Sequence, residues 1–228
     1  MPDPAVWYCI PSARADGGTL RLWKDRGYSI AVQRDPDAPR LSFGADYYWE
    51  HEWDGYPKAV NRLCREVLKE FPETLVCVTG GDDVEPDPTH DPRVIQGDFA
   101  DHFKGTYGIF QPTGDEWSDS QGRIIERIAG SPWMGRDWIL KSMGGNGPIF
   151  EGFNHYYEDE HLQEAAKMQG VFWQRSDIVQ KHNHWTLDRS KGKPQRPAYL
   201  EKAQAMWDHD KRVFEQCKAN GFKESMPL

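Results

Sequence analysis

Four acidic side chains are crowded into six residues directly after an apolar run. Residues 74–79 read TLVCVT, two glycines follow, and Asp82, Asp83, Glu85 and Asp87 come next. Like charges at this spacing repel one another, and a desolvated carboxylate is costly unless a cation neutralises it. The pattern therefore favours a divalent metal ion bound at these acids, and an acidic surface turn is the alternative.

A calcium-binding loop of the EF-hand type does not fit this cluster. Asp83, Glu85 and Asp87 alternate as the first three ligands of such a loop would. The loop also requires glycine at its sixth position and glutamate at its twelfth, where this chain has Pro88 and Val94. The calcium interpretation is therefore excluded.

Two later segments carry side chains that suit the same kind of ion. Residues 158–162 read EDEHL, and residues 181–185 read KHNHW. Carboxylates and imidazoles together bind hard-to-borderline divalent ions. His182 and His184 are two residues apart, so on an extended segment they point to the same side, and the spacing does not choose between them.

The elements that position these residues follow from the apolar pattern. Residues 5–10 and 28–33 are expected to form strands with a short helix at 18–27 between them. Residues 56–71 carry a continuous apolar stripe at helical spacing, and residues 74–79 resemble a central strand. The acidic cluster then lies at the carboxyl end of a strand, where open α/β sheets bind their ligands.

The rest of the chain is less regular. We expect a loop-rich insert at residues 37–55, a strand at 107–110, and helices at 122–129, 131–143 and 160–170. Residues 171–173 and 178–185 are expected to be extended, residues 190–197 to form a basic loop, and residues 199–220 to form a last amphipathic helix. The predicted class is α/β in a single domain. We expect residues 1–110, 111–190 and 191–228 to be three successive parts of this domain, the last with the basic loop and the last helix.

With these elements in place, the chain resembles glycosyltransferases of the GT-A fold, especially those similar to family 2. Gly81-Asp82-Asp83 is similar to their Asp-x-Asp or x-Asp-Asp motif, which holds Mn²⁺ or Mg²⁺ against the diphosphate of a nucleotide sugar. The resemblance implies a mixed, mainly parallel sheet flanked by helices and a nucleoside-diphosphate sugar as donor, with a UDP-sugar first. It also implies that Asp83 binds the metal and that Asp82 faces the ribose or the donor sugar.

The acidic helix start and the histidines also match this family. The resemblance implies that Asp159 is the general base of an inverting enzyme, with Glu160 beside it in the catalytic group. It implies further that a later histidine completes the metal shell. We favour His184 and retain His182 as a second ligand or as a group that orients the base.

The resemblance implies that residues 1–110 form the nucleotide-sugar-binding half and residues 111–190 the acceptor and catalytic half. In the family, the loop after the first strand wraps the nucleobase and an acid after the second strand lies near it, while the start of the long helix contacts the nucleotide. The positions that match are Pro11, Ser12, Ala13, Arg14 and Asp35 for the base, and Lys58 or Arg62 for the diphosphate.

The acceptor is the most open part of the prediction. The phrases SPWMGRDW and GVFWQRSD resemble bacteriophage enzymes that glycosylate hydroxymethylated pyrimidines, which implies DNA as an acceptor. Trp133 beside Arg136 is a candidate sugar or base platform, and Lys191 and Lys193 of the basic loop are candidate phosphate contacts. A glycan or small-molecule acceptor, a nucleotidyltransferase and a non-catalytic sugar- or DNA-binding module are the alternatives.

Composition restricts these alternatives. The chain has 228 residues and a net charge of −8, which argues against a surface that coats nucleic acid broadly. No run approaches the roughly 20 apolar residues of a membrane span and the N-terminus lacks a signal pattern, so we expect a cytoplasmic protein without a membrane partner. The four cysteines are expected to be reduced core thiols. A nucleotidyltransferase would need a glycine-rich loop after the first strand, and residues 11–14 do not provide one.

Overall fold

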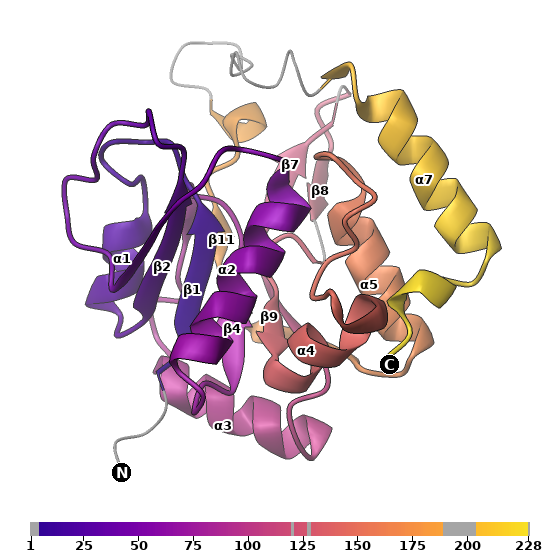
Figure 1. Cartoon of the computed structure of the whole chain (residues 1–228), viewed down its shortest axis with the longest axis horizontal. Helices are drawn as coiled ribbons and strands as arrows, with labels where there is room; N and C mark the ends of the chain where they lie inside the picture. The colour runs from indigo at the N-terminus through magenta and orange to yellow at the C-terminus, as the bar shows by residue number, and fades with distance from the viewer. Residues whose placement is uncertain (1–4, 120, 127–128, 189–203, 228) are drawn as a thin grey trace.

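The computed structural model describes residues 5–119, 121–126, 129–188 and 204–227. Figure 1 shows the helices packed around a central twisted sheet. In chain order the elements are β1 (Trp7–Pro11), α1 (Leu20–Asp25), β2 (Ser29–Arg34), β3 (Tyr47–Glu50), α2 (Tyr56–Glu70), β4 (Val76–Val78), β5 (Val84–Glu85), α3 (Pro92–Phe103), β6 (Ile109–Thr113), β7 (Glu116–Ser118), β8 (Ile124–Glu126), β9 (Trp133–Gly135), α4 (Arg136–Gly145), α5 (Glu158–Met168), β10 (Phe172–Val179), β11 (Lys181–His182), η1 (Trp185–Leu187), α7 (Trp207–Ala219) and η2 (Lys223–Ser225).

The central sheet has seven strands in the order β10-β6-β9-β4-β1-β2-β3. The pairs β1·β2, β2·β3, β1·β4 and β6·β10 are parallel, whereas β9 is antiparallel to both β4 and β6. Because β9 is antiparallel to both of its neighbours, β4 and β6 run in the same direction. All six strands other than β9 therefore end at one edge of the sheet. The predicted α/β class with a mixed, mainly parallel sheet is confirmed.

Successive residues of each strand supply two separate cores, as strand geometry requires. On β1, Trp7 and Cys9 face the side covered by α2, α4 and α5, while Tyr8 and Ile10 face the side covered by α1 and α3. On β9, Met134 joins the first core and Trp133 the second. Burial on both faces explains why the strands read as nearly continuous apolar runs.

The long helix α2 matches its predicted bounds closely. It begins at Tyr56, and Pro57 lies in its first turn, where a missing N–H costs no helical hydrogen bond. The side chains of its apolar stripe, including Leu63 and Val67, are completely buried against the sheet. In Figure 1, α2 lies across the face of the sheet formed by β1 and β4.

Several segments differ from the sequence predictions, among them the following four. Residues 37–55 contain the parallel edge strand β3, the predicted helix at 122–129 contains β8, and the predicted helix at 131–143 begins as β9. Periodicity does not separate a three-residue strand from a helical turn, so these short elements depend on their tertiary neighbours. The fourth segment, α3, was not predicted, although Asp91 caps it by accepting from Arg93 N and Pro92 follows as a first-turn proline.

The C-terminal segment packs on α5 and thereby supports one side of the site described below. Ala165 of α5 forms a small buried cluster with Cys217 and Phe222. The buried imidazole of His161 lies 2.7 Å from Glu224 of η2 through its Nε2 atom.

All four cysteines are buried and free, as predicted. No helix in the described part of the chain is both long enough and apolar enough to cross a membrane.

Candidate active site

Three strands that run in the same direction, β4, β6 and β10, deliver the central polar residues to one edge of the sheet. Asp83 follows β4, Asp115 follows β6, and His182 follows β10. These strands are separated in the chain but point the same way in the sheet, so their carboxyl ends meet. This is the edge at which open α/β sheets bind ligands.

His182 lies between the two carboxylates. Its Nε2 is 3.3 Å from Oδ1 of Asp83, and its Nδ1 is 2.5 Å from Oδ1 of Asp115. The backbone fixes this arrangement, because Asn183 N donates to the Asp83 carbonyl at 2.8 Å and His182 N donates to the Gly114 carbonyl at 2.9 Å. The imidazole is therefore held by the segments that follow β4 and β6.

Electrostatics at this triad favours a positive charge between the acids. Burial alone would lower the pKa of His182, but hydrogen bonds to Asp115 and Asp83 outweigh it and raise the pKa to about 9. Burial raises the pKa of Asp83, and the bonds to His182 more than compensate, so the net shift is downward. These two contacts favour a proton on the ring, and a metal ion bound at Nε2 would take the place of that proton.

The Asp115 carboxylate occupies the space that a side chain at position 130, which is glycine, would fill. It is 1% exposed, and a Cβ added at Gly130 would lie 1.8 Å from its Oδ2 atom. Asp115 was not predicted from the sequence. The signal was present, since Gly114-Asp115 follows an apolar strand just as the acidic cluster follows β4.

The turn between β4 and the acids is held by tyrosine hydroxyls. Tyr8 donates to the Gly81 carbonyl at 2.8 Å, and Tyr56 donates to the Gly80 carbonyl at 3.0 Å. Each tyrosine comes from a different element, β1 and α2 respectively. The direction in which Asp83 leaves the strand is therefore fixed from both faces of the sheet.

Asp82 faces away from this triad, toward the loop after β1. Ser12 Oγ donates to its Oδ2 at 2.6 Å, and Arg14 Nε lies 3.1 Å from its Oδ1. Burial raises its pKa, although Ser12 and Arg14 oppose that effect. The predicted base-binding residues Ser12 and Arg14 therefore lie beside the predicted ribose contact.

Backbone contacts lock the same loop against the acidic turn. Thr19 N donates to the Asp82 carbonyl at 2.9 Å, and a Cβ on Gly18 would lie 1.9 Å from that oxygen. Gly18 also has φ +55°, a conformation that favours glycine. The close approach of the Asp82 carbonyl and the positive φ together explain why residue 18 is glycine.

A buried arginine that the sequence analysis missed organises the predicted base loop. Arg34, at the end of β2, is 1% exposed, and its guanidinium donates to the carbonyls of Ser12, Ala13 and Arg14 at 3.0, 3.3 and 2.8 Å, and to that of Pro39. Pro11 is the last residue of β1, so this loop starts at the strand end. Asp35 accepts a hydrogen bond from Trp53 N at 2.5 Å.

A large cavity opens beside the triad. Its volume is about 940 Å³, and its lining includes Asp83, Asp115, His182 and His184. Asp159 and Glu160, in the first turn of α5, line the same cavity, and so does Glu158. The structure therefore brings the predicted metal ligands and the predicted catalytic acids to one cavity, although Asp83 and Asp159 lie about 75 residues apart in the chain.

The two histidines have different neighbours there. His182 contacts both carboxylates, whereas His184 Nδ1 lies 2.7 Å from Thr186 Oγ1 and caps η1. Their rings are 4.9 Å apart. Geometry thus favours His182 over our preferred His184 as the group aimed at Asp83.

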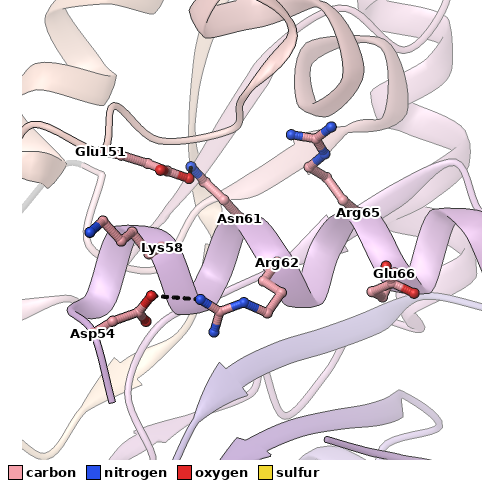
Figure 2. Close-up of a pocket in the computed structure, with 7 residues that line it drawn as sticks. All are labelled: Asp54, Lys58, Asn61, Arg62, Arg65, Glu66 and Glu151. Carbon is pink, nitrogen blue, oxygen red and sulfur yellow. Dashed lines mark hydrogen bonds and ion pairs between the residues drawn. The ribbon is translucent and has the colours of Figure 1, made fainter. Parts of the chain in front are cut away.

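Lys58 and Arg62 lie elsewhere. Figure 2 shows both on α2 in a second cavity of about 370 Å³, where Arg62 is paired with Asp54 at 2.7 Å. Arg62 also donates to Gln33 Oε1 at 2.7 Å. The structure does not bring either cation to the cavity that contains Asp83.

The predicted acceptor platform is wrong. Trp133 is completely buried in β9, and its indole N–H donates to Gln180 Oε1 at 2.6 Å. Because β9 is antiparallel, Arg136 emerges at the opposite edge of the sheet, where its backbone N–H donates to the Leu75 carbonyl at 2.8 Å. Lys191 and Lys193 lie outside the described residues.

The residues present fit a divalent ion of the Mg²⁺ or Mn²⁺ type. Asp83 and His182 Nε2 offer one oxygen and one nitrogen donor 3.3 Å apart, and Asp115 holds the other ring nitrogen. Metal-binding histidines ordinarily have such a carboxylate partner, which fixes the ring. Ions that bind with one or two protein carboxylates complete their shell with substrate phosphates and water.

Comparisons with known proteins give structural likeness only. No protein-family model matches the chain, and no curated protein matches it. A glycosyltransferase involved in glycosylation of the major capsid protein of PBCV-1 aligns with a TM-score of 0.48 and 12% identity, covering 82% of this chain and 98% of that one.

Two further solved structures align over similar lengths. A197 from STIV gives a TM-score of 0.46 at 9% identity, covering 79% of this chain and 86% of that one. A mutant of Drosophila β1,4-galactosyltransferase 7, in complex with manganese, UDP-Gal and xylobiose, gives a TM-score of 0.44 at 10% identity. This alignment covers 88% of this chain and 79% of that one. These three TM-scores are all below 0.5, and the function proposed below rests on the geometry of this chain.

Proposed function

We propose that this protein is a metal-dependent glycosyltransferase that moves a sugar from a nucleoside-diphosphate sugar to an acceptor hydroxyl. One observation carries the proposal. A single cavity at the carboxyl edge of the sheet is lined by Asp83 and His182, which suit a divalent ion, and by Asp159, which suits proton abstraction. Glycosyl transfer needs both groups, one for the departing diphosphate and one for the attacking hydroxyl.

The charge of the cavity explains why a metal would be required. Among its described lining residues are six acids, Asp83, Asp115, Asp119, Glu158, Asp159 and Glu160, and no lysine or arginine. A diphosphate would be repelled by such a lining in the absence of a cation. Asp83 and His182 would hold the ion, which supplies neutralisation of the charge that develops on the departing nucleoside diphosphate.

The protein's own residues supply positioning and proton transfer. Ser12, Arg14 and Arg34 organise the loop expected to hold the base, and Asp115 orients His182. The Asp159 carboxylate takes the proton from the acceptor hydroxyl as its oxygen bonds to the anomeric carbon. The bond from that carbon to the diphosphate oxygen breaks at the same time, and its electron pair leaves with the diphosphate. Attack opposite the leaving group inverts the anomeric centre.

A binding measurement tests the donor half of the proposal. Isothermal titration of the full chain with UDP is expected to show binding in Mn²⁺ and none after EDTA treatment. Asp83→Ala should abolish the Mn²⁺-dependent binding, because it removes the carboxylate that faces His182. Asp98→Ala is a matched control, since Asp98 pairs with Arg175 and does not line the cavity.

The outcomes separate the alternatives. UDP binding that is equal with and without Mn²⁺, or unchanged in Asp83→Ala, overturns the metal site. A nucleotidyltransferase would release pyrophosphate from a nucleoside triphosphate, which a coupled assay detects. An inert sugar- or DNA-binding module would bind no nucleotide in either condition.

A further inference from the structure

The cavity extends from the proposed metal residues to a group of aromatic side chains. These come from four separate segments: Trp117 on β7, Tyr156 and Tyr157 before α5, Trp185 on η1, and Trp207 on α7. Trp207 contacts Tyr156 and Tyr157 with ring centroids 4.7 and 5.1 Å apart. A cavity near the upper end of the usual ligand-site range has room for a second substrate beside a nucleotide sugar.

The aromatic group is fixed in place before any ligand binds. Asp210 of α7 is 0% exposed, and its carboxylate accepts hydrogen bonds from the backbone N–H groups of Asn154, His155 and Tyr156, each at 3.0 Å. Tyr157 has φ +68° and stacks on Phe214 of α7 at 5.3 Å. A loop held this way presents its rings with little ordering cost on binding.

The same wall carries carboxylates rather than cations. Glu158, Asp159 and Glu160 follow Tyr157 directly, and the described lining contains no lysine or arginine. A phosphodiester chain needs clustered cations, and the described part of this lining carries carboxylates in their place. An uncharged sugar suits both features, because its hydroxyl groups donate to carboxylates while its C–H faces pack on aromatic rings.

We propose that the wall formed by Tyr156, Tyr157 and Trp207 binds an uncharged saccharide, which is the acceptor of the transfer reaction. The assignment of this saccharide as acceptor rests on the proposed function, because Asp159 lies next in the chain to this wall and would take the proton from its hydroxyl. Saccharide binding itself depends on the wall alone. The expected acceptor therefore shifts from DNA to a neutral sugar or glycan.

Saturation-transfer NMR tests the wall without relying on catalysis. The probes are the methyl glycosides of glucose, galactose, mannose, xylose and N-acetylglucosamine with their common disaccharides, and a duplex containing 5-hydroxymethylcytosine. At least one saccharide is expected to show transfer, and Trp207→Ala should weaken its binding by about 10-fold or more through loss of a stacked ring. UDP binding in Mn²⁺ should not change in this variant.

Matched variants keep the test decisive. Trp53→Ala removes an exposed tryptophan, 52% accessible against 38% for Trp207, that does not line the cavity, and it should leave saccharide binding unchanged. Tyr156→Ala replaces Trp207→Ala if the latter does not fold, as judged by its thermal transition. The saccharide wall is overturned if no saccharide shows saturation transfer, if both wall variants show undiminished saturation transfer, or if the duplex alone binds. Saccharide binding that depends on Trp207 but occurs in a protein without Mn²⁺-dependent UDP binding supports the wall and overturns the glycosyltransferase.

Discussion

Asp115 Oδ1 lies 2.5 Å from His182 Nδ1, so the ring presents its other nitrogen to Asp83. Asp115 thus acts through His182 and not on a ligand directly. We expect Asp115→Asn to lower Mn²⁺ affinity in the presence of UDP by about 10-fold to 100-fold, because a neutral partner makes the imidazole less basic and orients it less firmly. Manganese binding followed by electron paramagnetic resonance measures this change.

The control for this prediction is another acid of the same cavity. Asp119 pairs with Arg123 at 2.7 Å, so Asp119→Asn removes one negative charge without touching His182. Equal loss of Mn²⁺ affinity in both variants would assign the effect to general charge and not to the orientation of His182.

Asp159 is expected to act on the acceptor and not on the donor. Asp159→Asn should reduce turnover by about 100-fold or more with unchanged UDP affinity, because a general base contributes in the transition state. Steady-state kinetics with the donor and an acceptor saccharide, together with UDP titration, give both quantities. Weakened UDP binding with unaltered turnover would make Asp159 a binding residue instead.

Gly18 is expected to tolerate no side chain. Gly18→Ala should lower the free energy of unfolding by about 1 to 3 kcal/mol and weaken UDP binding, because the added Cβ would meet the Asp82 carbonyl at 1.9 Å in a left-handed backbone conformation. Gly44→Ala is the matched control, since nothing lies within 4 Å of its added Cβ. Urea denaturation of both variants decides the case, and equal stabilities would contradict it.

Asp87 makes stability depend on pH in the acid range. Burial raises its pKa, but hydrogen bonds from the backbone N–H groups of Val179, His90 and Thr89 outweigh it and lower the pKa from 3.8 to about 2. A lowered pKa in the folded state means that the contribution is complete well above pH 3.8 and is lost as pH falls toward 2. The size of the shift corresponds to about 2 kcal/mol.

Asp87→Asn should therefore be less stable than the wild type at pH 6, and the gap should narrow between about pH 5 and pH 2. Equilibrium urea denaturation across this range measures the gap. A difference in unfolding free energy that stays constant with pH would show that the charge of Asp87 does not contribute.

The elements that could be predicted from the sequence are those whose apolar pattern lies within one short stretch of the chain. The apolar stripe of α2 and the strand β4, which precedes Asp83, were both predictable because each depends on local periodicity. The acids at the start of α5 suit the positive end of the helix dipole, and the role expected of Asp159 came from the family resemblance.

The remaining residues depend on sheet order, which periodicity does not encode. Asp115 meets His182 only because β6 and β10 are neighbours, and Trp133 is buried only because three residues form a strand between β4 and β6. Trp207 reaches the cavity from the last long helix, whose packing on α5 is equally non-local. Each of these placements requires the assembled fold.

The position of β9 also has a consequence for synthesis on the ribosome. Strands β1, β2, β3 and β4 are complete once Val78 has emerged, yet the strand that pairs with the open side of β4 begins only at Trp133. Throughout that interval Val76–Val78 present an unpaired apolar edge, the kind of edge that recruits other chains. Nascent chains stalled between these two points should therefore associate with one another or with chaperones, and the hazard should end when Trp133–Gly135 fills the gap.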